Sequence, residues 1–509
     1  MRAGVLSAAA AVLLAGPTVL AFFSGGYFDA ARAWAGLVAW LLVVVALLVA
    51  PRGLPRTRAA WLALAGIALL AGWTLASMTW APVAGAAYHA GQLVALYTGA
   101  LLAATVVLRG RRTLRVVEPA LAAGALVVIG YGLSGRLLPG MLHFARSVSA
   151  QARLEQPLTY WNAMGELAAL GFVLTARVAG DGERRPATRA LAAASCAPLG
   201  MGLYLSFSRG ALFACLAGLL VLAGAAPLRA QLEAIVVAVA AGVLASLVAS
   251  PFAGITSLAG SLATRERQGA AALVALTAIA VSAGLAQRAL ARRSHASPLP
   301  LPRHALRIAV LAAAAGLALA IAAGGAEDTG RQISAGPGRL VTLASNRYDF
   351  WRVALRAFAA EPLRGVGAGG WQAWWLRYRP FPGFARDAHS LPLQTAAELG
   401  VIGLLLLAAL LAGIALAARS AHRAVPALAA GPLAGFVVYA VHAPLDWDWE
   451  MPAVTLVAIA LAGTLLAMGE ADASRVVAQR AGFTGGSRRQ KLRSARAKVL
   501  GDPAEEPAS

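Results

Sequence analysis

The stretch ARDAHSLPLQTAAELGVIGLLLL, residues 385–407, places one histidine between a basic, aromatic segment and a long run of leucines. A neutral imidazole at this point could accept a proton, because histidine titrates near physiological pH. The alternative is a histidine that only forms local hydrogen bonds where a helix begins. His389 is therefore a candidate general base, and its role depends on the polar groups that share its surroundings.

Two arginines stand out in apolar or amphipathic sequence. Arg209 interrupts LYLSFSRGALFACLAGLL, and Arg347 opens SNRYDFWRVALRAF, whose apolar residues recur at helical spacing. A guanidinium stays charged at any pH and binds phosphate oxygens in a bidentate manner. Arg209 could also be an arginine that extends to the membrane surface from a tight helical hairpin. The two positions predict an anion site.

A third polar segment is RLEQPLTYWNAMGELA, residues 153–168. Aromatic residues are common where a helix meets the membrane surface, so Tyr160 alone is weak evidence for a site. Arg153 and Asn162 are harder to explain by the membrane, and we expect both to face the same compartment as Arg209. These three residues join the predicted anion site.

Three carboxylates alternate in HAPLDWDWEMPAV, residues 442–454: Asp446, Asp448 and Glu450. Carboxylate oxygens could bind a divalent cation. No further ligand cluster is visible in the sequence, so pairing with the arginines, or helix capping, is the favoured interpretation. We expect no metal at the site.

The elements that position these residues are predicted from hydropathy. Hydrophobic residues make up 59% of the 509-residue chain and charged residues only 13%, about half the charged fraction of soluble proteins. Apolar runs of roughly 18 residues or more can cross the ~30 Å hydrocarbon layer. The sequence therefore predicts an all-α polytopic membrane protein with about 12–14 spans. Our count is fourteen, starting near Val5, Trp34, Ala59, Ala87, Val116, Trp161, Ala190, Ala211, Leu232, Ala270, Ile308, Leu391, Val425 and Met451.

The net charge of +22 follows the same pattern. Most arginine clusters, such as those at 51–58, 109–115, 182–189, 291–307 and 418–423, come after even-numbered spans. Cytoplasmic loops carry such an excess, so we expect both termini in the cytoplasm and no nucleic-acid partner. The short turn TRER, residues 264–267, falls on the opposite side and departs from this rule.

Three regions follow from this topology. Residues 1–150 are expected to form N-terminal transmembrane helices, the first of them retained. Residues 151–468 would form the domain with the candidate site, including a long outer loop at 324–390. Residues 469–509 are expected to be a basic, disordered cytoplasmic tail. Cys196 and Cys215 lie inside apolar runs and indicate neither a disulfide nor a zinc site.

The motifs in this central region resemble the O-antigen ligase and polymerase family, membrane glycosyltransferases of bacterial cell envelopes. The resemblance rests on SRGA at 208–211, on R-x3-W…P-x2-G-V-G from Arg347 to Gly367, and on AH-x3-LQ-x3-ELG-x-IG from Ala388 to Gly403. The YWNAMG entry to the sixth span also fits. The resemblance covers roughly residues 150–465.

The resemblance implies a reaction. Members of this family transfer a glycan from an undecaprenyl-pyrophosphate donor to an acceptor hydroxyl, at the outer face of the cytoplasmic membrane. It implies direct, inverting transfer without a metal or other cofactor, to a glycan, lipid or other acceptor. His389 would act as the base, and the residues that bind the diphosphate or the substrate would be Arg209, Arg347, Arg153, Asn162 and Tyr160. Supporting roles are expected for Glu398, Gln394, Asp446 and Asp448.

Two alternatives remain open. A polysaccharide polymerase would share this chemistry and differ only in its acceptor. A flippase or other transporter of lipid-linked oligosaccharides would instead place charges or broken helices near the membrane midplane. The unusual polar residues of this chain are predicted to gather at the outer face, which favours chemistry there.

Overall fold

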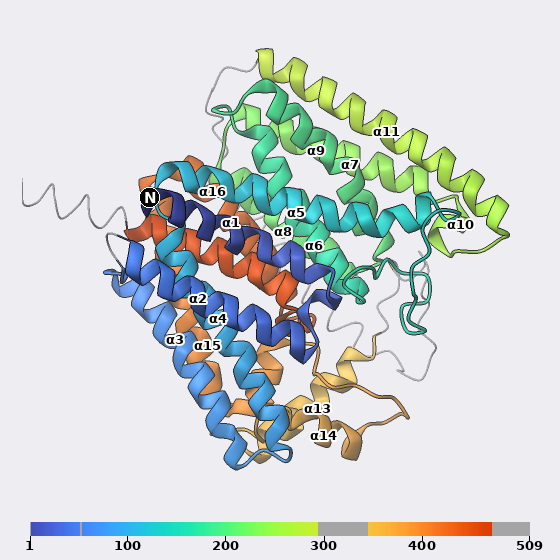
Figure 1. Ribbon diagram of the computed structural model, residues 1–509. Helices are drawn as coiled ribbons and strands as arrows, with labels where there is room; N and C mark the ends of the chain where they lie inside the picture. The colour runs from blue at the N-terminus through green and yellow to red at the C-terminus, as the bar shows by residue number, and fades with distance from the viewer. Residues whose placement is uncertain (1, 51–52, 294–339, 341–344, 471–509) are drawn as a thin grey trace, which may run out of the picture.

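A computed structural model describes residues 2–50, 53–293, 340 and 345–470 of the chain. The described residues form α-helices and short 3₁₀ turns, with no β-strand (Figure 1). Ten of the described helices are long and apolar enough to cross a membrane. The predicted all-α polytopic class is confirmed.

The helices follow the predicted spans closely. In chain order the first nine are α1 (Arg2–Ala21), α2 (Asp29–Val49), α3 (Arg58–Ala76), α4 (Ala84–Val107), α5 (Arg111–Leu137), α6 (Trp161–Gly180), α7 (Pro186–Leu205), α8 (Arg209–Ala225) and α9 (Arg229–Ala249). They are followed by α10 (Ala253–Thr256), α11 (Leu262–Arg293), α13 (Arg347–Ala360), α14 (Trp371–Tyr378), α15 (Leu391–Ala424) and α16 (Pro426–His442), and a final helix spans Pro452–Glu470.

Every predicted span except the one near Ile308 coincides with one of these helices. That span, part of the loop at 324–390 and nearly all of the tail from 469 lie outside the described residues. Three of the matching helices are not among the ten: α8 and α16 are apolar but have only 17 residues each, and α7 has 20 residues but is less apolar.

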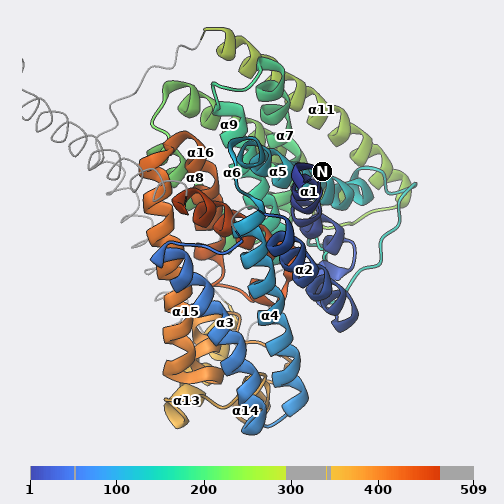
Figure 2. The same ribbon diagram turned by 60° about the vertical axis from the view of Figure 1, so that its left-hand side comes forward.

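The centre of the bundle is occupied by α6 and the final helix. The apolar window of α6 is entirely buried and that of the final helix is 94% buried, whereas α1, α2 and α11 bury only 28%. A helix that is apolar on all sides is stable only inside a protein or a membrane. Around α6 pack α5, α7, α8, α9 and α16 (Figures 1 and 2).

One end of the bundle, here called the basic end, is joined by contacts among the predicted cytoplasmic segments. The Glu470 carboxylate accepts hydrogen bonds from the backbone N–H of Thr57, at 2.6 Å, and from its hydroxyl. Arg177 of α6 lies 3.8 Å from Glu118 of α5 and donates to the carbonyl of Ala427 in the first turn of α16. These contacts bring one terminus of α3, α5, α6, α16 and the final helix to the same end.

The opposite end, here called the site end, carries α13 and α14, which pack beside α15 near the ends of α3 and α4 (Figure 2). The helix α15 is broken at Gly400, where φ is +65°. The N–H groups of Val401 and Ile402 donate to the carbonyls of Pro362 and Leu363, at 2.9 and 3.3 Å. A neighbouring segment thus replaces the missing helical hydrogen bonds of α15.

Small residues set the spacing between helices, as in other membrane bundles. A Cβ at Gly413 of α15 would lie 2.4 Å from the backbone nitrogen of Ala63 in α3, while a Cβ at Gly72 of α3 would meet nothing within 4 Å. The first glycine is therefore required by packing, and the second is not.

This contrast predicts different effects of the same substitution. Gly413→Ala should force α3 and α15 apart and cost about 1–3 kcal/mol. Gly72→Ala should be neutral or stabilise by up to about 1 kcal/mol, since glycine weakens a helix. Thermal unfolding of the purified protein in detergent measures both. Equal unfolding temperatures for the two variants would contradict the close crossing of α3 and α15.

Candidate functional site

The centre of the candidate site is an ion pair between Arg347, the first residue of α13 with a side chain 19% exposed, and Asp446 in the turn before the final helix. The Asp446 side chain is fully buried. Its second oxygen accepts a hydrogen bond from the Tyr160 hydroxyl at 2.6 Å, and the Asn162 amide donates to that hydroxyl at 2.7 Å. The structure thus joins residues from three distant parts of the sequence.

Electrostatics keep this pair charged. Burial opposes the charge on Asp446, but the adjacent Arg347 outweighs it and lowers the pKa of the carboxyl. Burial also opposes the charge on Arg347, and Asp446 raises the pKa of the guanidinium. Burial and the charge of Asp446 raise the pKa of Tyr160, which therefore stays protonated and remains a donor.

His389 lies beside this pair, at the entry to α15. Its ring packs 5.0 Å from that of Phe350 and 6.0 Å from that of Trp447, centroid to centroid. Nδ1 lies 2.8 Å from the carbonyl oxygen of Asp387. A carbonyl only accepts, so Nδ1 carries the proton of the neutral ring and Nε2 is the basic atom.

Burial lowers the pKa of His389, and the charge of Arg347 adds to this effect while Asp446 opposes it. The imidazole is therefore neutral near pH 7. The backbone of His389 is in the left-handed region, with φ of +54°. Non-glycine residues rarely adopt this conformation, which is common at functional sites.

Arg209 begins α8 at the site end. Ser208 caps the helix, its hydroxyl accepting from the N–H of Ala211 at 3.3 Å. A Cβ at the next residue, Gly210, would lie 3.0 Å from the ring of His442. Since His442 pairs with Asp448, two residues from Asp446, Arg209 and His389 lie at the same end of the bundle.

Arg153 is close to the pair but does not bond to it. Its guanidinium carbon lies 3.8 Å from the centre of the Trp161 ring, and its nitrogens donate to the carbonyls of Ala150 and Ser149. Trp161 in turn contacts the ring of Tyr160, with centroids 4.9 Å apart. Arg153 is therefore linked to the candidate site through the contacts of these two aromatic rings.

Glu398 and Gln394 hold the loops that surround the site. Glu398 accepts from the N–H of Trp371 at 3.3 Å, and its carbonyl accepts from Gly367 at 2.9 Å. Gln394 accepts from the N–H of Ala388, next to His389, at 3.2 Å. The glycine segment 365–371 thus forms tight turns against α15. The backbone N–H groups of Gly367 and Trp371 already donate hydrogen bonds to Glu398.

A second buried cluster was not predicted from the sequence. His442 Nδ1 lies 2.5 Å from Asp448 and 3.6 Å from Glu166, and all three side chains are fully buried. Glu166 lies four residues after Asn162 on α6, hence on the same helix face. This spacing was the feature of the sequence that could have indicated the cluster.

The three alternating carboxylates have separate partners. Asp446 pairs with Arg347, Asp448 pairs with His442, and Glu450 lies 3.9 Å from Arg32.

The ion pair of Arg347 and Asp446 predicts a large effect of its loss. Asp446→Asn leaves Arg347 as an uncompensated charge and should cost about 3–5 kcal/mol. Glu361→Gln is the matched control, because the ion pair of Glu361 with Arg364 is about half exposed. Loss of that exposed pair should lower the free energy of unfolding by less than about 1 kcal/mol. Thermal unfolding in detergent compares the two.

The double variant Asp446→Asn/Arg347→Met removes both charges and should recover part of the loss. If Asp446→Asn unfolded at the same temperature as Glu361→Gln, the pair would not hold α13 to the bundle.

Comparison with known protein families gives a match over about a third of the chain. Residues 252–408 match a family model described as O-antigen ligase. The match includes Arg347, His389 and the motifs from Arg347 to Gly403, whereas Arg153, Arg209 and Asp446 lie outside it. No curated protein matches the chain. The family match supports the assignment of this chain to the O-antigen ligase family.

Proposed function

We propose that this protein transfers a glycan from an undecaprenyl-pyrophosphate carrier to an acceptor hydroxyl at the outer face of the bacterial cytoplasmic membrane. The family match supports glycosyl transfer of the ligase or polymerase type and lipid-linked glycan substrates. The observation that carries the finer proposal is a permanent positive charge, Arg347, beside a neutral imidazole, His389.

The leaving group requires the positive charge. As the bond between the anomeric carbon and the diphosphate oxygen breaks, the electron pair stays on the diphosphate. Preorganised donors that meet this developing charge lower the barrier. A guanidinium has five N–H donors, and Asp446 holds Arg347 by its Nη2, so the remaining donors can bind phosphate. Arg209 supplies a second guanidinium from α8.

The acceptor requires the base. In the proposed step, an acceptor hydroxyl attacks the anomeric carbon from the side opposite the diphosphate, and Nε2 of His389 takes its proton. The new glycosidic bond forms with inversion. The hydrogen bond from Nδ1 to Asp387 keeps Nε2 as the proton acceptor. Tyr160 and Asn162 act through Asp446, and so they position Arg347 rather than touch the substrate.

An apolar groove supports a lipid-linked donor. It has a volume of about 610 Å³ and is lined by α1, α2, α4 and the final helix. Phe23 and Ala30 line it and flank Tyr27 in the sequence, and the Tyr27 ring packs 5.4 Å from that of Trp447. Trp447 also contacts His389. We infer that the groove holds the polyprenyl chain while the diphosphate reaches Arg347.

The catalytic assignment predicts the behaviour of two variants. In proteoliposomes supplied with lipid-linked glycan, His389→Ala should slow transfer by ~10²–10⁴, and Arg347→Lys by ~10²–10³, since lysine lacks the planar fork. His89→Ala, a partly exposed histidine near Asp29, should leave transfer unchanged. Because the pKa of His389 is lowered, the wild-type rate should fall only below about pH 6.5. Normal transfer by His389→Ala would refute the base assignment.

Deletion in the native organism separates the related functions. Loss of glycan attachment with accumulation of polymer indicates a ligase, and accumulation of single repeat units indicates a polymerase. Purified protein that moves the lipid-linked glycan between leaflets without joining it to an acceptor would indicate a transporter.

The groove predicts a chain-length effect. Gly16 lines it, and a Cβ there would meet nothing within 4 Å, so Gly16→Leu should fill the groove without disturbing the fold. We expect KM to rise at least tenfold for a long polyprenyl donor and to stay the same for a short-chain analogue. Gly4→Leu, on the same helix and equally open, is the control. An equal KM for both donors in the Gly16→Leu variant would place the lipid chain elsewhere.

A further inference from the structure

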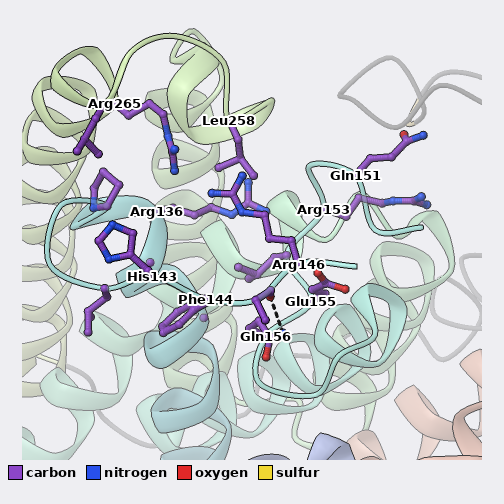
Figure 3. Close-up of a pocket in the computed structure, with 17 residues that line it drawn as sticks. Arg136, His143, Phe144, Arg146, Gln151, Arg153, Glu155, Gln156, Leu258 and Arg265 are labelled. Carbon is purple, nitrogen blue, oxygen red and sulfur yellow. Dashed lines mark hydrogen bonds between the residues drawn. The ribbon is translucent and has the colours of Figure 1, made fainter. Parts of the chain in front are cut away.

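A basic cavity lies at the site end, separate from the Arg347–Asp446 pair (Figure 3). It has a volume of about 190 Å³ and is enclosed by the end of α5, the segment 139–156 and the start of α11. The lining includes four arginines and one carboxylate: Arg136, Arg146, Arg153, Arg265 and Glu155. Figure 3 shows Arg136, Arg146 and Arg265 converging on the same space.

The one carboxylate of the lining, Glu155, compensates only part of the charge of the four arginines. Arg136 is only 6% exposed, and its nitrogens donate to two backbone carbonyls, of Ile255 at 2.5 Å and of Ala152 at 2.6 Å. The Nε of Arg265 is buried without a hydrogen-bond partner. No hydrogen bond or ion pair joins Arg146 to another described residue. Partial burial, and next the charge of Arg265, lower the pKa of Arg146.

The one carboxylate in the lining of the cavity, Glu155, is hydrogen-bonded to Ser147. Glu155 accepts from the N–H of Ser147 at 2.7 Å and from its hydroxyl at 2.5 Å. Among the described residues, no ion pair joins it to the arginines of the cavity. The cavity therefore carries a net positive charge, and like charges this close disfavour each other.

The helix crossing that creates the cavity is specific. A Cβ at Gly269 of α11 would lie 2.5 Å from the carbonyl oxygen of Leu137, at the end of α5. Only a glycine allows this approach, which brings Arg136 and Arg265 to the same space. These arginines lie at the end opposite the basic clusters, where the charge rule for membrane topology gives no reason for them.

We propose that this cavity binds an anionic group of the glycan substrate, a phosphate or a carboxylate, in addition to the carrier diphosphate. The inference rests on the proposed function and names the class of glycan: an acidic one. The cavity shares Arg153 with the approach to the candidate site, through Trp161 and Tyr160. A glycan whose reacting end lies at His389 can therefore place an anionic group among these arginines.

Binding to the purified full-length protein tests this inference. The probes are inorganic phosphate and glucuronate, which represent the two sources of the anion, with methyl glucoside as the neutral control. Titration calorimetry at low salt should detect phosphate, glucuronate or both, and no methyl glucoside. Whichever anion binds more tightly identifies the group on the glycan.

The variants locate the binding. Arg146→Gln/Arg265→Gln should weaken anion binding at least tenfold, since each charge-assisted hydrogen bond contributes roughly that much. Arg288→Gln is the matched control, because Arg288 is exposed on the same helix as Arg265. Arg347→Gln should also leave binding of the anion to the cavity intact.

The results separate this inference from the proposed function. Unchanged binding in Arg146→Gln/Arg265→Gln, or loss of binding only in Arg347→Gln, would overturn the cavity as an anion site. So would the absence of binding by both anions. A failure of the catalytic proposal appears instead in the transfer assay with His389→Ala, which does not depend on the cavity.

Discussion

The pair of Arg347 and Asp446 is the interaction on which the site end depends. A guanidinium and a carboxylate are stable away from water only if both are paired and their remaining groups are hydrogen-bonded. Tyr160 and Asn162 complete the pair on the carboxylate side. The pair thereby joins α13, the entry to α6 and the turn before the final helix. His389 keeps its neutral form beside this fixed charge.

Charge is distributed differently over the three polar clusters of this end. The pair at Arg347 is balanced one to one, and the cluster of Glu166, His442 and Asp448 contains an excess of acidic groups. The cavity lined by Arg136, Arg146 and Arg265 has an excess of positive charge. A substrate with several negative charges would therefore be drawn first to the arginines, while the balanced pair keeps its geometry.

Much of the fold was predictable because a long apolar run has only one common structure in a membrane. The predicted starts of the spans match the described helices for this reason. From the sequence we expected Arg209, Arg347 and His389 to meet at the outer face, and the carboxylates near Asp446 to pair with arginines or to cap a helix. The cluster around His442 and the grouping of Arg136 with Arg265 were not predicted. They depend on which helices cross and how closely, and the glycines at 210 and 269 control this only in the folded chain.

The break in α15 has a mechanical consequence. At Gly400 the helix gives up its own hydrogen bonds, and the carbonyls of Pro362 and Leu363 take their place. If the stretch from 362 to 367 swung away, the N–H groups of Val401 and Ile402 would lose their hydrogen-bond partners, at a cost of about 1–3 kcal/mol each. This stretch is therefore a fixed wall and not a movable cover.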